Sequence, residues 1–227
     1  MFKNIIFLLI SILFLSCTNK TDKKIADIPE ASGISFCRDT DTLVVANDEG
    51  YMYEISTKGK ILKKHYLGKY DLEGVVCDKN RYIFADEKGG LLYVDRKSLK
   101  KTYRSLRLKL PKNAGIEGIE KINNKLYLAI QAKKKSKSKI LVVTPQAKII
   151  KSIKTHITDM SGLSYYKNRF YIISDHHDKI YLYDLKKEKI LKKYKVKKSA
   201  QEGITFDEKG SLYIADDNGK VFKREAL

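Results

Sequence analysis

Five short stretches of the chain place an oxygen-bearing side chain directly before a glycine. The five side chains belong to Ser32, Glu73, Glu117, Ser161 and Glu202. The glycines that follow them lie 41, 44, 44 and 41 residues apart. If these stretches line one axis, three carboxylates face one another, and each pair repels by roughly 3 kcal/mol at about 5 Å and an effective dielectric of about 20. The pattern therefore predicts raised carboxyl pKa values, an approaching lysine or a bound cation.

Calcium is the cation that this donor set favours. Ca²⁺ takes oxygen ligands in variable geometry, whereas Mg²⁺ demands a tighter octahedron. No histidine occupies any of the five positions, which argues against zinc. In one interpretation Glu73, Glu117 and Glu202 bind calcium. In the other they cap backbone amides of neighbouring loops, and composition alone does not separate the two.

A second set of polar residues closes a strand-like run after each glycine. Its members are Asn47, Asp86, Gln131, Asp175 and Asp216. Asp and Asn favour strand-ending turns, which is the interpretation that we prefer. In the alternative, further metal ligands or groups behind the ligands come from Ser32, Ser161, Asp86, Asp175 and Asp216. His176 and His177 follow on a loop, where we expect them to be solvated.

These residues recur with a period of about 42 residues, the length of one blade of a β-propeller. Each repeat contains runs of strand length that are rich in Tyr, Ile and Val. In four repeats a last run alternates and carries lysine, as an outer strand with one face in water does. We therefore predict an all-β fold, a five-bladed β-propeller with four-stranded antiparallel blades.

The fifth repeat ends at Leu227 after only three expected strands. The segment 24–28, which precedes the first repeat, can supply the fourth strand. Such an exchange closes the ring and hides edges that invite aggregation. We assign the propeller to residues 25–227, with the last blade completed by the N-terminal strand of the mature chain.

The N-terminal end is typical of a bacterial lipoprotein. Lys3 precedes an apolar run that ends at Ser16 and Cys17. The run is shorter than the roughly 20 residues of a spanning helix. We predict a signal peptide over 1–16, lipidation with palmitate-like chains at Cys17, and a tether over 17–24. The protein is then exported and anchored to the lipid bilayer. The preferred location is the outer membrane, with the protein facing the periplasm.

The chain is strongly basic, with 46 Lys and Arg against 27 Asp and Glu. A solvated lysine-rich surface is the preferred explanation. The alternative is attraction to an anionic lipid or glycan, since each basic residue near an anionic membrane adds about 1 kcal/mol. An exported protein is not expected to bind nucleic acid, and any protein or small-molecule ligand is left unidentified by the sequence.

Two cysteines remain after Cys17 is assigned to lipidation. Cys37 and Cys77 lie at corresponding ends of the first strand in successive repeats. In an oxidising compartment they can pair as a disulfide. Two buried thiols explain them as well, so both interpretations stay open.

The repeat cores carry a resemblance to a known family. Ala31-Ser32-Gly33-Ile34, Leu72-Glu73-Gly74-Val75 and Gln201-Glu202-Gly203-Ile204, with the strand 212–217, resemble the SdiA-regulated (YjiK-like) family of exported bacterial propellers. The likeness extends from about Ile28 to Phe222. It implies a five-bladed propeller, export and a calcium site, which we transfer to Glu73, Glu117 and Glu202 because they match the Glu-Gly positions.

The sequence favours a binding or scaffold module over an enzyme. It contains no Gly-x-Ser-x-Gly elbow, no His-Glu-x-x-His helix and no phosphate-binding loop. The alternative is a metal-dependent hydrolase of lactonase or phosphoesterase type, with the metal at the channel mouth acting as a Lewis acid. In that alternative Asp175 or Asp216 is the candidate base, and the idea rests on fold analogy.

Overall fold

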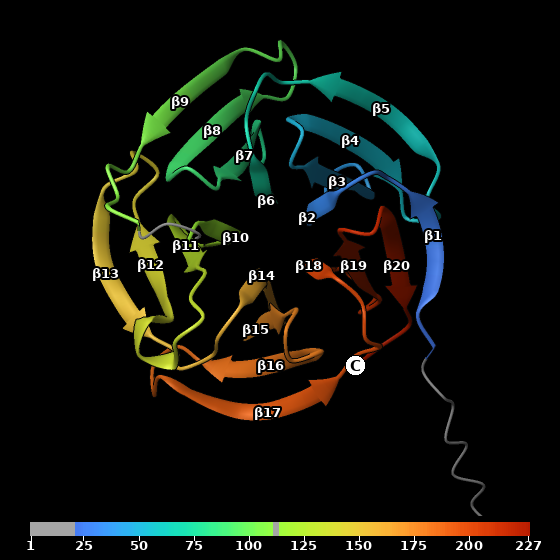
Figure 1. The fold of residues 1–227 in the computed structure, drawn as a ribbon. Helices are drawn as coiled ribbons and strands as arrows, with labels where there is room; N and C mark the ends of the chain where they lie inside the picture. The colour runs from blue at the N-terminus through green and yellow to red at the C-terminus, as the bar shows by residue number, and fades with distance from the viewer. Residues whose placement is uncertain (1–20, 111–113) are drawn as a thin grey trace, which may run out of the picture.

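A computed structural model describes residues 21–110 and 114–227. Its strands form five four-stranded antiparallel sheets that stand around a central axis (Figure 1). The expected five-bladed β-propeller is thereby confirmed. Within the two described ranges, no helix is long and apolar enough to cross a membrane.

The strands follow one another outward from the axis in each blade. Blade 1 contains β2 (Ala31–Cys37), β3 (Thr42–Asn47), β4 (Tyr51–Ser56) and β5 (Ile61–Tyr66). Blade 2 contains β6 (Leu72–Cys77), β7 (Arg81–Asp86), β8 (Gly90–Asp95) and β9 (Lys101–Ser105). Blade 3 contains β10 (Ile116–Ile122), β11 (Lys125–Ile130), the 3₁₀ turn η1 (Lys135–Lys137), β12 (Lys139–Val143) and β13 (Ile149–Lys154). Blade 4 contains β14 (Met160–Tyr166), β15 (Arg169–Ser174), β16 (Lys179–Asp184) and β17 (Lys189–Lys195). Blade 5 contains β18 (Gln201–Phe206), β19 (Leu212–Asp216), β20 (Lys220–Arg224) and β1 (Lys23–Asp27).

Blade 5 joins the two ends of the chain. Strand β1 pairs antiparallel with β20, and the N–H of Ile28 donates to the carbonyl of Gly219 at 3.0 Å. Arg224 adds a bidentate ion pair with Asp22, at 2.6 and 2.7 Å. The predicted closure is confirmed, and Asp22 lies inside the segment that we expected to be tether.

The hydrophobic core lies between the faces of adjacent blades. In one cluster Val44 and Met52 of blade 1 pack with Leu72, Phe84 and Leu92 of blade 2. Strand β3 is buried along its whole length, whereas the outer strand β5 is mostly exposed. Burial against both neighbours explains why the inner runs read as continuously apolar and the outer runs alternate.

The glycine of each repeat is required by the close approach of the five inner strands. A Cβ on Gly33 would lie 2.6 Å from Cα of Gly74, and a Cβ on Gly203 would lie 3.0 Å from Cα of Gly33. Only a residue without a side chain lets neighbouring backbones come this close. The glycine recurs in every repeat because the inner strands of a closed ring approach one another this closely.

Cys37 and Cys77 form a disulfide between the ends of β2 and β6, with their Cα atoms 5.3 Å apart. The sequence left open whether these cysteines form a disulfide or remain two buried thiols, and the structure shows the disulfide. The bond joins blades 1 and 2 at the end of the inner strands that lies away from Glu73.

Candidate functional site

The glutamates that precede the repeat glycines come together at one end of the central channel, which we call the channel mouth. Glu73, Glu117 and Glu202 line one narrow cavity together with Ser161. They come from the inner strands β6, β10 and β18, and Ser161 comes from β14. The free volume of about 10 Å³ is about what one water molecule requires. The cavity thus has room for a single ion.

A β-bulge positions each of these side chains. The pairing of inner and second strand skips from Leu72 to Gly74 and from Ile116 to Gly118. The same skip spans Ser32, Ser161 and Glu202 in the other blades. The extra residue of a bulge is left out of the ladder and its side chain is re-aimed, a device found beside functional sites. The Ser or Glu before glycine is therefore the bulged residue in all five blades.

The electrostatics of the cavity disfavour three free carboxylates. Burial, followed by the charges of Glu117 and Glu202, raises the pKa of Glu73 to about 10. Burial and the charge of Glu117 raise the pKa of Glu202 to about 9. Burial also raises the pKa of Glu117, which is 7% exposed, to about 7. No lysine or arginine is among the main causes of these three shifts, so no nearby positive charge offsets them.

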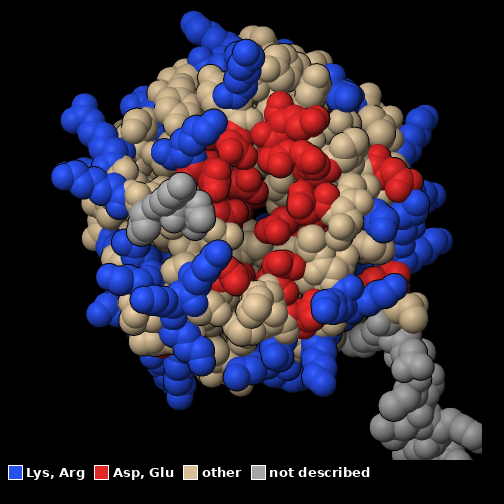
Figure 2. Space-filling model, viewed as in Figure 1, with Lys and Arg blue, Asp and Glu red and all other residues tan. Residues whose placement is uncertain are grey.

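The acidic surface around the cavity is larger than the sequence indicated. Figure 2 shows acidic side chains gathered at the centre of this face and lysine and arginine around its rim. We call the following carboxyl groups the acidic mouth, because each either has a raised pKa or carries a charge that raises the pKa of another member: Glu30, Asp48, Asp71, Glu73, Glu87, Glu117, Asp159, Asp175, Glu202 and Asp217.

Six of these acids were missed from the sequence, although the repeat alignment could have found them. Glu30, Asp71 and Asp159 each stand three residues before a repeat glycine. Asp48, Glu87 and Asp217 each follow the end of a second strand by one residue. The alignment compared only the residue directly before each glycine. Comparing the positions further from the glycine as well would have shown both groups of acidic residues.

The two serines are held by backbone carbonyls. Ser161 Oγ donates to the carbonyl of Gln201 at 2.6 Å, and Ser32 Oγ donates to the carbonyl of Glu30 at 3.1 Å. Each hydroxyl oxygen keeps lone pairs with which to accept. Ser161 lines the cavity, whereas Ser32 does not.

The second set of polar residues does not form one ring. The prediction that its five members occupy equivalent positions in the five blades was wrong. Asn47, Asp86 and Asp216 pair opposite the residue two before the glycine, but the partners in blades 3 and 4 are Ile130 and Ser174. Gln131 and Asp175 lie one position further along, because β11 and β15 end at Ile130 and Ser174, one residue earlier than the alignment assumed. Asp175 thus belongs to the acidic mouth.

Asp86 has the role expected of a turn residue. Its Oδ2 accepts the hydroxyl of Tyr103 at 2.7 Å, and its Oδ1 accepts the N–H of Asp71 at 3.4 Å. Asn47 likewise accepts the N–H of Tyr51 at 3.2 Å and donates to the carbonyl of Pro29 at 2.8 Å. Asp216 accepts the N–H of Asn218 through Oδ1 at 3.0 Å, but its Oδ2 is buried without a hydrogen bond.

The residues of the mouth fit a hard cation by chemistry. All are oxygen donors, the cavity admits one ion, and no hydrogen bond of the described residues joins Glu73, Glu117 or Glu202 to a backbone N–H. Asp48 Oδ1 is also buried without a partner. No three His, Cys, Asp or Glu side chains in 21–110 and 114–227 already stand in the arrangement of a metal site. Calcium, with its variable geometry, is the ion that such a donor set suits.

The opposite end of the channel opens into a bowl of about 850 Å³, lined by the far ends of all five inner strands. Glu120 lies in this bowl and accepts the N–H groups of Tyr165 and Lys121, each at 2.6 Å. Burial raises the pKa of Glu120 to about 7 despite these bonds. Nearby, Cys77 and Phe36 donate their N–H groups to Ser35 and Thr205 of the preceding blades. Polar side chains thus bridge adjacent blades on this side.

Replacing Glu120 with Gln should remove part of the pH dependence of stability. Because the pKa of Glu120 is raised in the folded state, its protonation favours folding. This contribution to the free energy of unfolding is full below about pH 4.5 and is lost as the pH rises through 7. From pH 5 to pH 8 the wild type should lose on the order of 2 kcal/mol relative to Glu120→Gln. Urea unfolding of both proteins across this range measures the difference, and parallel profiles would contradict the expectation.

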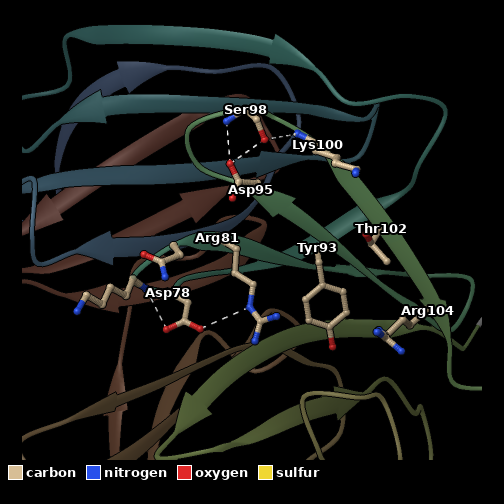
Figure 3. A pocket seen from close by; sticks show the side chains of 10 residues that line it. Asp78, Arg81, Tyr93, Asp95, Ser98, Lys100, Thr102 and Arg104 are labelled. Carbon is tan, nitrogen blue, oxygen red and sulfur yellow. Dashed lines mark hydrogen bonds and ion pairs between the residues drawn. The ribbon is translucent and has the colours of Figure 1, made fainter.

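A basic groove of about 460 Å³ lies on blade 2 (Figure 3). Arg81, Tyr93 and Arg104 line it from β7, β8 and β9, and Lys79 and Lys100 complete its positive charge. The guanidinium of Arg81 lies 5.1 Å from the centre of the Tyr93 ring and 3.7 Å from Asp78. The groove presents guanidinium and ammonium donors, which is the chemistry that recognises carboxylate, sulfate or phosphate groups.

Comparisons with known proteins agree with this architecture. The crystal structure of Myxococcus xanthus glutaminyl cyclase superimposes with a TM-score of 0.72 at 12% identity, covering 90% of this chain and 93% of that one. At this identity the likeness shows the fold alone. No curated protein matches the chain. The sequence model of one family, described as SdiA-regulated, matches residues 12–222. Because that match spans nearly the whole length, the chain belongs to the SdiA-regulated family.

Proposed function

We propose that this protein is an exported, lipid-anchored β-propeller that binds calcium at the channel mouth and acts as a binding or scaffold module. The observation that carries the calcium proposal is the cavity formed by Glu73, Glu117 and Glu202, three bulged glutamates with raised pKa values and no compensating cation. A bound Ca²⁺ would neutralise the repulsion that the sequence predicts. The hydrolase alternative rests on fold analogy alone.

Isothermal titration calorimetry with CaCl₂ tests this proposal directly. We expect one tight site per chain, weakened at least tenfold in Glu73→Gln and in Glu202→Gln because each loses one charged ligand. Asp86→Asn is the matched control, since both Asp86 oxygens are already engaged by Tyr103 and Asp71. Equal calcium affinity in wild type and both glutamine variants would rule out the mouth as the site.

We also propose that Cys17, which lies outside the described residues, carries the lipid anchor. Support comes from the apolar run that ends at Ser16 and Cys17. Cys17→Ser should move the protein from the membrane fraction to the soluble fraction of the cell envelope and abolish labelling with radioactive palmitate. Retention of label in Cys17→Ser would contradict the assignment.

The same variant tests an anionic partner, which we propose from the basic groove and from the basic rim of the molecule (Figure 2). Released Cys17→Ser protein should sediment with vesicles that contain phosphatidylglycerol and should be released by about 0.5 M salt, because salt screens exposed charges. Binding that is equally strong to neutral phosphatidylcholine vesicles would count against an electrostatic contact.

A further inference from the structure

The bowl at the far end of the channel and the basic groove on blade 2 are neighbouring cavities. Their volumes are about 850 and 460 Å³, and Asp78 and Lys79 line both of them. These two residues lie on the turn between β6 and β7, so the bowl leads over this turn into the groove. We call the combined cavity the basic tract. It extends from the inner strands to the outer strand β9, and each part alone has the size of a small-molecule site.

Most carboxylates that line the basic tract already have partners. Asp78 pairs with Lys121 at 2.7 Å and with Arg81 at 3.7 Å. Guanidinium, hydroxyl or backbone N–H groups engage three others, which are Asp39, Asp95 and Glu120. Glu208 is the lining carboxylate without such a partner in the described part of the chain. The acidic groups therefore neutralise little of the charge of the remaining cations.

These remaining cations are spread along the whole basic tract. Arg38 and Lys167 lie in the bowl, and Lys79 lies at the shared turn. Lys100 and Arg104 lie in the groove. Within 21–110 and 114–227, none of these side chains takes part in a salt bridge. A single small anion would neutralise only some of them, whereas a chain with repeated negative charges can neutralise all of them.

In the groove, two guanidinium groups lie on either side of one aromatic ring. Figure 3 shows Arg81 and Arg104 flanking Tyr93, and the Arg81 guanidinium lies 5.1 Å from the ring centre. Burial raises the pKa of Tyr93, and the charges of Arg81 and Arg104 oppose this shift, which places both guanidinium groups near its hydroxyl. The planar guanidinium fork matches the two oxygens of a carboxylate. The groove is thus suited to a ligand that presents carboxylates.

Uncharged polar side chains lie between the cations of the basic tract. The side chains of Asn80 and Thr102 in the groove and of Asn123 in the bowl make no hydrogen bond to another described residue. They offer donors and acceptors to neutral hydroxyl groups. Phe36 and Phe206 add apolar surface to the bowl. Carboxylates, hydroxyl groups and apolar C–H faces occur together in acidic sugars.

We propose that the basic tract binds an acidic polysaccharide, a chain of sugars that carry carboxylates, which lies from the bowl across the β6–β7 turn into the groove. Such a ligand rests on the anionic partner proposed above and gives that partner a chemical class and a path on the molecule. A chain can lie inside a hollow of this shape, whereas the flat surface of a bilayer can touch only its rim. The basic tract lies at the end of the channel opposite the acidic mouth, so this binding does not require calcium.

Calorimetric titration of the Cys17→Ser protein with hexagalacturonate at low salt tests this assignment. Digalacturonate should bind about tenfold more weakly, because it fills only one part of the basic tract. The neutral chain maltohexaose should show no measurable binding. Poly-L-glutamate of similar length should bind about tenfold more weakly than hexagalacturonate, because it lacks the hydroxyl groups that the uncharged side chains recognise.

Two variants in the Cys17→Ser background test whether the ligand crosses both cavities. Arg38→Gln removes a guanidinium from the bowl and Arg104→Gln removes one from the groove, and each should weaken hexagalacturonate binding about tenfold. Lys193→Gln, on the exposed outer strand β17, is the matched control for the loss of one positive charge. All three side chains are exposed, so the midpoint of thermal unfolding should stay near that of the parent protein.

The outcomes separate this site from the broader proposal of an anionic partner. If anionic vesicles bind and hexagalacturonate does not, the partner is a lipid surface and the polysaccharide site is overturned. If neither binds, the anionic partner itself is removed. Unchanged affinity in either arginine variant would show that the chain does not cross both cavities. Equal binding of poly-L-glutamate would show that charge alone selects the ligand, and each of these two results would overturn the site.

Discussion

Calcium at 100 times its dissociation constant should raise the midpoint of thermal unfolding, and EDTA should reverse the increase. Binding to the folded state alone contributes about 2.7 kcal/mol under these conditions. For a chain of this size that corresponds to an increase of about 5 to 10 °C. The physical reason is that Ca²⁺ offsets the repulsion among Glu73, Glu117 and Glu202, which share one narrow cavity.

Glu117→Gln should change this behaviour in two opposite directions. Without calcium at pH 8, the variant should unfold at a higher temperature than wild type, because one buried carboxylate that resists ionisation has been removed. With calcium, most of the upward shift should be lost, because a charged ligand is missing. Differential scanning calorimetry in EDTA and in CaCl₂ gives both midpoints.

The matched control for this experiment is Glu188→Gln. Glu188 lies on the surface and pairs with Lys151 at 2.8 Å, and exposed pairs of this kind contribute little to stability. Its calcium shift should equal that of wild type. A wild-type midpoint that neither EDTA nor calcium moves would remove the cation proposal.

Loss of the Cys37–Cys77 disulfide should destabilise the protein by about 4 kcal/mol, because the bond closes a loop with a sequence separation of 40. For a chain of this size the midpoint should fall by about 8 to 15 °C. The double variant Cys37→Ala, Cys77→Ala measures this effect against wild type in thermal unfolding. The bond links the inner strands of blades 1 and 2, so its loss also loosens one seam of the ring.

Treatment with dithiothreitol provides the control for the disulfide experiment. The reductant should lower the midpoint of the wild type to near that of the double variant and leave the variant unchanged. A wild-type midpoint that is insensitive to the reductant while the thiols become reactive would show that the bond does not contribute to stability.

The fold was readable from the sequence because its main constraint is local and periodic. Each repeat needs a glycine where inner strands meet, as the 2.6 Å approach at Gly33 shows. The strand missing from the fifth repeat and the unused strand before the first repeat also complement each other, which β1 and β20 confirm. The three glutamates of the mouth were found for the same reason, since they neighbour the repeat glycine.

Other features depend on distances that only the tertiary structure decides. Whether Cys37 meets Cys77 depends on the spacing of two blades, and the sequence left that question open. The placement of Asp175 in the acidic mouth follows from the end of β15 at Ser174, one residue earlier than the alignment assumed. The unpartnered oxygens of Gln201 and Asp216 depend on which donors the packing of two blades leaves out. Patterns along the chain determine which residues line the axis. Which polar atoms find hydrogen-bond partners, and which charges interact, depends on atoms that only the folded structure brings together.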